Sequence, residues 1–129
     1  MAKPIVKTGH YTKIKKITVK MTKKTKAEIP KAVIDDGYNL REKSKWVVAA
    51  VEDFVKKPVK DIEGALVSEL LTNTLDTHDV FSLPTDLVTE INQVSAKVVL
   101  EHPGVKPSQS SIIRAAISRK LLNLDELFG

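Results

Sequence analysis

The chain has 129 residues, of which 42% are hydrophobic and 29% are charged, and it contains no cysteine. This length favours one domain, or two very small units that share one core, and the composition is that of a globular rather than a disordered chain. The lack of cysteine excludes a disulfide scaffold and a cysteine zinc site, and it fits a reducing compartment. No apolar run is long enough to span a bilayer, and the basic N-terminus lacks the apolar core of a signal peptide, so we expect a cytoplasmic protein.

Charge is distributed unevenly along the chain. Residues 1–60 contain sixteen basic and six acidic residues, a net +10, whereas residues 61–129 contain five basic and ten acidic residues, a net −5. Residues 1–26 hold nine lysines and no acidic residue. A basic arm of this kind suits binding to a polyanion, although a solvated tail that only aids solubility would have the same composition.

The first predicted element is a strand, because polar and apolar residues alternate strictly from Lys16 to Met21. One face of this strand is expected to be buried, and it carries Ile17, Val19 and Met21. The opposite face carries Lys16, Thr18 and Lys20. A slip of one residue in the pairing register would exchange the two faces.

A helix is predicted next, within residues 26–36, and Gly37 is its expected C-terminal glycine. Because proline lacks a backbone N–H and clashes with the preceding turn, we expect this helix either to start at Pro30 or to be kinked there. Its apolar stripe is formed by Ile29, Val33 and Ile34.

A second helix is predicted to begin near Lys43 or Ser44, and Pro58 limits it. Its apolar residues are Trp46, Val47, Ala50, Val51 and Phe54. Residues 57–77 are predicted to be a connector, with a short helix within Glu63–Leu71. The leucines expected to pack this helix on the main body are Leu66, Leu70 and Leu71.

The same order of elements recurs in the second half of the chain. A strand at His78–Leu83 stops at Pro84, and Thr85 is the predicted N-cap of a helix that runs to about Glu101 and is ended by Gly104. Apolar residues recur in this helix at intervals of three or four positions, which predicts a buried face formed by Leu87, Ile91, Val94 and Val98.

The last predicted helix begins near Ser108. Its periodicity places one set of residues inward, namely Ile112, Ile113, Ala116, Ile117 and Leu121. The residues expected to point outward are Arg114, Arg119 and Lys120. Residues 124–129 are predicted to form a final turn packed on the core, with a partner-docking peptide as the alternative.

One strand and two helices of this size cannot bury their own apolar faces, but two copies can, by pairing the strands and interlocking the helices. We therefore expect a mainly α-helical fold with a short two-stranded antiparallel ribbon. The expected organisation is a flexible basic arm (1–14), a first unit (15–56), a connector (57–77), a second unit (78–123) and a tail (124–129). A ribbon of this kind has the right width for the major groove of DNA.

The repeated order resembles the ribbon–helix–helix DNA-binding proteins of the Arc, MetJ and CopG group. Those proteins are normally dimers of one short chain, so this sequence is similar to a tandem, single-chain pseudo-dimer, with a layout like that of the TraY proteins of conjugative plasmids. The motifs that carry the resemblance are Phe81-Ser82-Leu83-Pro84, Gly104, and the run Ser110-Ser111-Ile112-Ile113-Arg114. The first unit departs from the pattern because no proline follows its strand.

The resemblance implies which residues would touch DNA. The side chains that point out of the ribbon would contact base edges, and here they are Lys16, Thr18, Lys20, His78, Val80 and Ser82. The start of each second helix would hold a backbone phosphate, at Lys43, Ser44, Lys45, Ser108, Gln109, Ser110 and Ser111. The N-terminal arm would add nonspecific affinity through Lys3, Lys7, Lys13 and Lys15. The outward positions of the second strand include no lysine or arginine, and Asp79 is adjacent to them in the sequence. We therefore expect the two strands to contact different bases in the two halves of the DNA site.

Each of these features taken alone also fits a structural role. Lysine often guards the edge of a strand, serines before a helix are common caps, and Trp46 and Phe54 fit a core. The sequence contains no catalytic constellation, no phosphate-cradling loop and no set of histidines with the spacing of metal ligands, so we predict a protein that is not an enzyme and that uses no cofactor or metal.

The main hypothesis from sequence is a sequence-preferring double-stranded DNA-binding protein, prokaryotic and cytoplasmic. The resemblance implies a transcriptional repressor or an accessory protein of plasmid transfer or partition, without membrane association. It would act as a monomeric pseudo-dimer or as a homo-oligomer on DNA. The alternative hypothesis is a protein-interaction module, such as an antitoxin or an assembly adaptor, whose protein partner binds the acidic C-terminal half.

Overall fold

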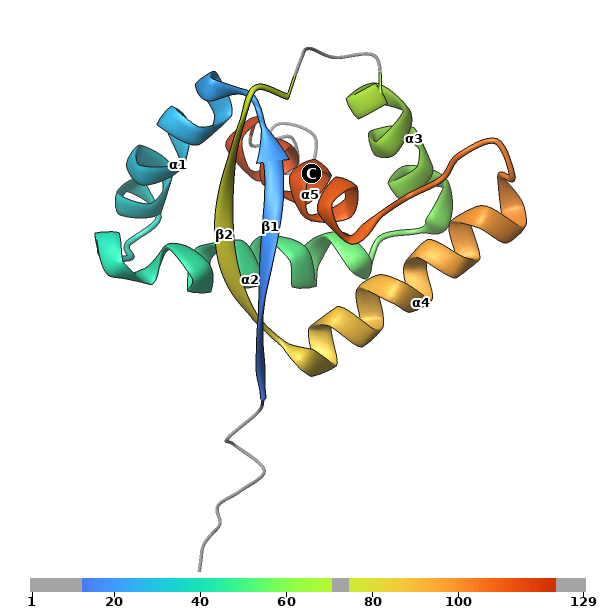
Figure 1. Cartoon of the computed structure of the whole chain (residues 1–129), viewed down its shortest axis with the longest axis horizontal. Helices are drawn as coiled ribbons and strands as arrows, with labels where there is room; N and C mark the ends of the chain where they lie inside the picture. The colour runs from blue at the N-terminus through green and yellow to red at the C-terminus, as the bar shows by residue number, and fades with distance from the viewer. Residues whose placement is uncertain (1–12, 71–74, 123–129) are drawn as a thin grey trace, which may run out of the picture.

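The computed structural model describes residues 13–70 and 75–122 of the chain. These residues form a mainly helical fold with one two-stranded antiparallel sheet, which confirms the expected class. In chain order the elements are β1 (Ile14–Met21), α1 (Lys23–Asp35), the 3-10 turn η1 (Leu40–Glu42), α2 (Lys43–Val55), α3 (Val59–Leu70), β2 (Thr77–Pro84), α4 (Thr85–Glu101) and α5 (Gln109–Leu122) (Figure 1).

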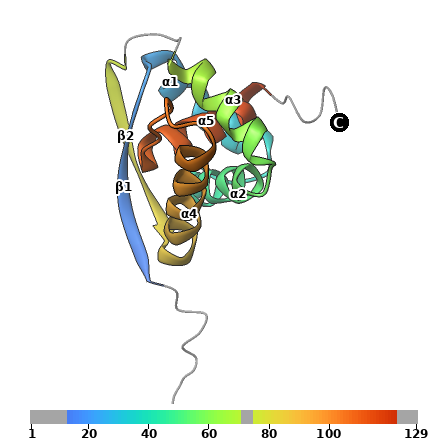
Figure 2. The same ribbon diagram turned by 90° about the vertical axis from the view of Figure 1, so that its right-hand side faces the viewer.

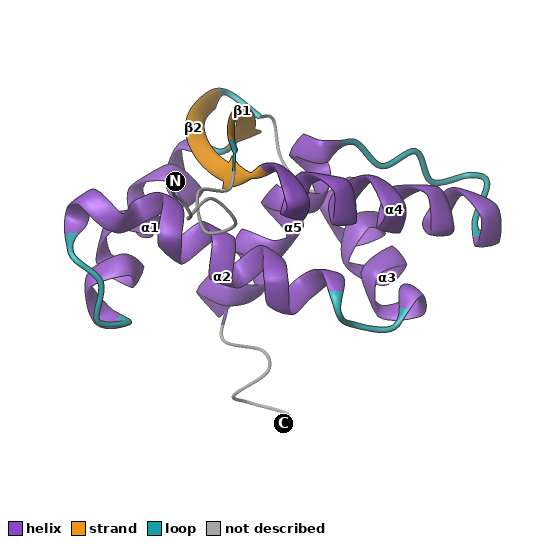
Figure 3. Cartoon of the chain, turned by 90° about the horizontal axis from the view of Figure 1, so that it is seen from below, coloured by secondary structure: helices purple, strands orange, loops and turns teal. Residues whose placement is uncertain are grey.

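The strands β1 and β2 pair with each other within one chain, although three helices separate them in sequence. Ile14 lies opposite Pro84 at one end of the ladder, and Met21 lies opposite Thr77 at the other. The ribbon forms one layer and the helices gather on one side of it, as Figure 2 shows most directly. The view from below gives the same arrangement, with both strands at one edge of the helical layer (Figure 3).

The inner face of the ribbon is part of the core. Ile17, Val19 and Met21 are buried, as the alternation predicts, and Phe81 and Leu83 of β2 are fully buried beside them. The helices supply the rest of this core, and the five residues predicted for the buried face of α2 are all buried: Trp46, Val47, Ala50, Val51 and Phe54. The predicted face of α4 is also confirmed, by Leu87, Ile91, Val94 and Val98.

The order strand, helix, helix occurs twice, as β1-α1-α2 and as β2-α4-α5, with α3 between the two sets. Residues 62 positions apart take equivalent places in the strands and first helices: Thr22 and Pro84 are the N-cap positions, and Ile29 and Ile91 are both buried. Because Thr18 lies opposite Val80, the approximate twofold axis of the antiparallel ribbon passes through this pair.

Helix α1 begins earlier than predicted, but it ends where the sequence predicts. It begins at Lys23, because the Thr22 hydroxyl accepts a hydrogen bond from the N–H of Thr25, and it runs through Pro30 rather than starting there. Ile34 is 49% exposed and does not belong to the buried stripe. Gly37 ends the helix as predicted, with φ of +90°.

The segment between the two sets is more helical than predicted. Helix α3 starts at Val59, directly after Pro58, whose carbonyl accepts from the N–H groups of Asp61 and Ile62. Ile62 and Leu66 are its buried residues, which confirms the packing predicted for Leu66. The side chain of Leu70, and Leu71 as a whole, lie outside the described part of the chain.

Two roles predicted at the ends of α4 are wrong, those of Thr85 and Gly104, whereas the predicted end of the helix at about Glu101 is confirmed. Thr85 is the first residue of α4, Pro84 takes the N-cap position, and the Thr85 N–H instead donates to the Lys13 carbonyl at 2.9 Å. The helix ends at Glu101, and His102 caps it by donating its N–H to the Val98 carbonyl. Gly104 comes after this cap and does not adopt a positive φ.

We predict opposite effects of adding a methyl group at two glycines. The Tyr38 N–H donates to the Val33 carbonyl and the Gly37 N–H to the Ile34 carbonyl, both at 3.0 Å, so the left-handed conformation of Gly37 is fixed by the end of α1. Gly37→Ala should lower the free energy of unfolding by about 1–2 kcal/mol.

The matched control is Gly64→Ala in the middle of α3. A Cβ atom at Gly64 would meet nothing within 4 Å, and the residue has a helical backbone, so this change should raise the free energy of unfolding by about 0.5–1 kcal/mol. Urea unfolding of the two variants measures both effects, and equal shifts of the same sign would contradict the assignment of Gly37.

Candidate nucleic-acid interface

The outward face of the ribbon brings together the six residues predicted to contact bases. They form three directly opposed pairs across the strands: Lys16 with Ser82, Thr18 with Val80, and Lys20 with His78. Ser82 is partly exposed and the other five are exposed. The two strands therefore present one continuous solvent-facing surface, which carries two lysines and a histidine and no acidic side chain.

Asp79 lies on the opposite face of the ribbon from these six residues. Its carboxylate accepts from the Lys43 ammonium, with 2.9 Å to each oxygen, and the Asp79 side chain is only 16% exposed. The Lys43 Nζ also lies over the Phe81 ring, 5.5 Å from its centroid. Asp79 thus does not face the surface formed by the six outward residues, and the ammonium of Lys43 is engaged at the ribbon rather than extended into solvent.

The first turns of α2 and α5 are tied to the ribbon in equivalent ways. The Ser82 N–H donates to Ser44 Oγ at 3.0 Å, and the Lys20 N–H donates to Ser110 Oγ at 3.3 Å. Each serine is the second residue of its helix, and the approximate twofold axis relates Lys20 to Ser82. Each serine oxygen accepts from the ribbon, so its hydroxyl hydrogen remains able to donate to an anion.

The start of α2 is preceded by a capping box. Asn39 Oδ1 accepts from the Arg41 N–H, and the Asn39 N–H donates to Glu42 Oε1 at 3.0 Å. The Lys45 ammonium lies 3.1 Å from Glu42 Oε2, and Lys45 is largely exposed. The Asn39 N–H and, to a lesser extent, the Lys45 ammonium hold the pKa of Glu42 below its usual range.

The start of α5 is closed by two serines that cap each other. The Ser108 N–H donates to Ser111 Oγ at 2.7 Å, and the Ser111 N–H donates to Ser108 Oγ at 3.0 Å. Gln109 Nε2 donates to the Asn92 side-chain oxygen at 3.1 Å, which ties this turn to α4. Ser108 and Ser111 therefore act as helix caps, which is the structural alternative predicted for these serines. The hydroxyl of Ser110, in contrast, bonds to the ribbon.

Arg114 occupies a place that the sequence did not predict. It was expected to point outward, but its side chain is only 13% exposed, and its Nε donates to Glu69 Oε1 of α3 at 2.8 Å. One terminal nitrogen donates to the Lys20 carbonyl at 3.0 Å. Helix α5 therefore holds both backbone groups of Lys20, the N–H through Ser110 and the carbonyl through Arg114.

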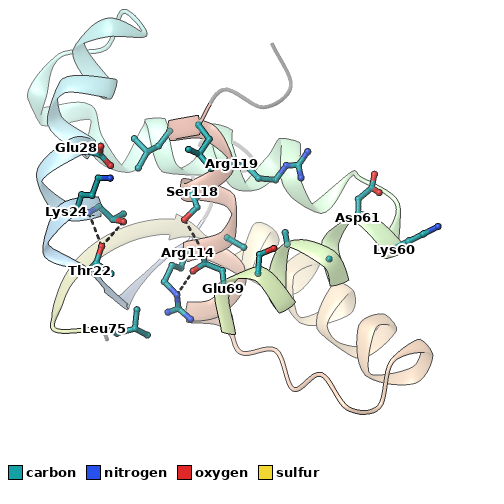
Figure 4. A pocket seen from close by; sticks show the side chains of 17 residues that line it. Thr22, Lys24, Glu28, Lys60, Asp61, Glu69, Leu75, Arg114, Ser118 and Arg119 are labelled. Carbon is teal, nitrogen blue, oxygen red and sulfur yellow. Dashed lines mark hydrogen bonds and ion pairs between the residues drawn. The ribbon is translucent and has the colours of Figure 1, made fainter. Parts of the chain in front are cut away.

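The Arg114–Glu69 pair stands in the wall of a pocket of about 740 Å³ between α1, α3 and α5 (Figure 4). Ser118 donates to the second oxygen of Glu69 at 3.1 Å, and Arg119, also predicted to point outward, lines the same pocket. The sequence does show an acidic residue, Glu69, within a predicted helix. It gives no indication that Glu69 pairs with Arg114, because the two residues are far apart along the chain.

The remaining predicted residues lie at or beyond the ends of the described chain. Lys15 belongs to β1 rather than to a flexible arm, and Lys13 is exposed next to it. Lys3, Lys7 and the tail of residues 124–129 lie outside the described residues. Within residues 13–70 and 75–122, no helix is long and apolar enough to cross a membrane, and no group of three acidic or histidine side chains is placed to hold a metal.

We predict that the Arg114–Glu69 pair contributes strongly to stability. Arg114→Met removes the cation that balances a carboxylate with little exposure, and it should lower the free energy of unfolding by about 2–4 kcal/mol. The control is Lys31→Ala, which breaks the exposed pair between Lys31 and Asp35 on α1 and should leave the unfolding midpoint unchanged. Urea unfolding at neutral pH compares the variants, and similar midpoints for both would contradict this role of Arg114.

A second prediction concerns pH. The pKa of Glu42 is lower in the folded chain than in the unfolded chain, so its stabilising contribution is present above the unfolded pKa and is lost as the pH falls through the folded pKa. Glu42→Gln keeps an acceptor for the Asn39 N–H but carries no charge. The variant should be less stable than the wild type at pH 7, and the difference should shrink at about pH 3. A difference that stays constant between these pH values in urea unfolding would count against the capping role of the carboxylate.

Comparisons with known proteins leave this surface to be interpreted from its own geometry. No family model matches the chain, and neither the search of curated proteins nor the search of solved structures gave a match. Three features of the described residues bear on function: the outward face of the ribbon, the two helix starts bound to it, and the charges that surround them.

Proposed function

We propose that this chain binds double-stranded DNA by placing the β1–β2 ribbon in the major groove, as a tandem ribbon–helix–helix protein. The major groove is about 12 Å wide and admits a two-stranded ribbon. The observation that carries the proposal is the equivalent attachment of two helix starts, at Ser44 and Ser110, to the two ends of one exposed ribbon. The shared order of elements in the two halves supports it.

The outward side chains have the chemistry that base edges require. Lys16 and Lys20 donate hydrogen bonds and suit guanine O6 and N7, whereas Thr18 and Val80 offer methyl groups that suit the thymine methyl. Ser82 and His78 complete the surface as shorter polar contacts. The position of Asp79 on the inner face supports the proposal further, because a carboxylate on the outward face would repel phosphates.

The helix starts would fix the position of the ribbon on the duplex. The free N–H groups and the dipole at a helix N-terminus favour an anion, and a phosphate is the anion that DNA presents on both sides of the groove. The donors proposed at α2 are Ser44 and Lys45, with Lys43 held by Asp79. The donor proposed at α5 is the Ser110 hydroxyl, whereas Ser108, Gln109 and Ser111, also predicted from sequence, would shape this helix start through their own hydrogen bonds. Phosphate contacts would set the register, and the ribbon would select the sequence.

The biological role proposed for this activity is transcriptional regulation or an accessory function in plasmid transfer or partition. These roles follow from the resemblance to ribbon–helix–helix proteins. The arm lysines Lys3, Lys7, Lys13 and Lys15 would add affinity that does not depend on sequence.

The test is duplex binding by the wild type and by Lys16→Ala/Lys20→Ala, measured by fluorescence anisotropy over a range of salt concentrations. The wild type should lose affinity steeply with salt, with a slope of about −0.9 per phosphate contacted. The double variant should lose roughly tenfold or more in affinity for a selected sequence, while its unfolding midpoint stays unchanged because both side chains are exposed.

The matched control removes two positive charges elsewhere. Lys56→Ala/Lys97→Ala changes exposed lysines at the end of α2 and on α4, neither of which belongs to the ribbon. This variant should retain sequence preference and lose only a small part of the total affinity. Equal loss of affinity in the two double variants would show that charge alone matters, and it would remove the ribbon from the proposal.

A further inference from the structure

We infer that the ribbon reads an asymmetric DNA element, in which two guanines lie on the same DNA strand roughly three to four base pairs apart, and not an inverted repeat. The inference builds on the proposed function and concerns the arrangement of bases that the ribbon prefers. It follows from the strand pairing, because both outward lysines, Lys16 and Lys20, belong to β1.

The two lysines are not related by the approximate twofold axis of the ribbon. The axis passes through the Thr18–Val80 pair, so it exchanges Lys20 with Ser82 and Lys16 with His78. A symmetric ribbon would carry one lysine on each strand at equivalent places, and it would suit a palindromic site. Here one end of the outward face has a lysine opposite a histidine, and the other end has a lysine opposite a serine.

The β-strand to which a lysine belongs determines which DNA strand that lysine contacts. Paired strands lie about 4.8 Å apart, so in a groove about 12 Å wide β1 lies nearer to one DNA strand and β2 nearer to the other. A guanine presents O6 and N7 from its own side of the groove. Two lysines on β1 therefore favour two guanines on one DNA strand.

The spacing of the guanines follows from the strand. Lys16 and Lys20 are four residues apart, so their Cα atoms are separated by about 13 Å along β1. Base pairs repeat every 3.4 Å along the duplex axis, and the path along the groove is longer than the axis, which gives roughly three to four base pairs. Between the lysines, the methyl groups of Thr18 and Val80 favour a thymine near the centre.

The two ends of the ribbon also differ in how firmly they are held. At Lys20, Ser110 accepts from the N–H and Arg114 donates to the carbonyl. At the equivalent Ser82, Ser44 accepts from the N–H, but the residue of α2 that corresponds to Arg114 is Val48, which has no donor. The guanine read by Lys20 should therefore be the more strictly required of the two.

The experiment is selection of duplexes from a random pool with the full chain, followed by sequencing. The expected motif has two guanines on one strand around a central thymine. Lys20→Ala should erase the stronger guanine and Lys16→Ala the weaker one, each with a loss of roughly tenfold in affinity for the wild-type motif. A wild-type motif with guanines on opposite strands would overturn the inference while leaving the proposed function intact.

A sharper test exchanges one pair across the strands. Lys16→Ser/Ser82→Lys keeps the composition and the net charge, and position 82 is the twofold equivalent of Lys20. The ribbon then carries one lysine on each strand, so selection should yield an inverted repeat, with the guanine at one end moved to the opposite DNA strand. An unchanged unfolding midpoint shows that the exchange leaves the fold intact.

The remaining outcomes distinguish failure of the inference alone from failure of the proposed function as well. If the Lys16→Ser/Ser82→Lys variant is folded and still selects the wild-type motif, the inference is overturned, because the position of the lysine would then not determine which DNA strand is read. Steep salt dependence without any motif in the wild type, or no binding to duplexes at low salt, would overturn the proposed function and the inference with it.

Discussion

The antiparallel pairing of β1 with β2 is the interaction on which the rest of the structure depends. Closing the long connection between the strands costs conformational entropy, and burial of the inner face offsets this cost. Because side chains in a strand alternate strictly between two faces, burying Ile17, Val19 and Phe81 forces the intervening residues of both strands outward. The exposed surface is therefore a consequence of the core, and its composition can change without altering the fold.

Two ion pairs support the two strands of the ribbon in different ways. Lys43 and Asp79 join α2 to the inner face of β2, whereas Arg114 and Glu69 join α5 to α3 and, through the Lys20 carbonyl, to β1. Helix α3 has no counterpart in the second half of the described chain. The asymmetry of the ribbon is thus not confined to its outward side chains, since the helical layer beneath supports the two ends by different contacts.

Sequence patterns predicted the local part of this structure well. Alternation fixed the faces of β1, and the spacing of apolar residues identified the buried faces of α2 and α4, because both signals arise within one element. The patterns failed where a distant partner decides the outcome: Arg114 turns inward toward Glu69, 45 positions away, and Thr85 continues the backbone pairing to Lys13 instead of capping a helix. The ties at Ser44 and Ser110 depend on the strand register, which no local pattern contains.

Pairing of the two strands within a single chain has an evolutionary consequence. In a ribbon made of two identical chains, every substitution appears twice, so the two strands always change together. In this chain each strand is encoded separately, and a substitution at Lys16 leaves its twofold equivalent, His78, as it was. The two ends of the ribbon are therefore free to diverge one residue at a time, and formation of the ribbon does not require the encounter of two molecules, however scarce the protein is.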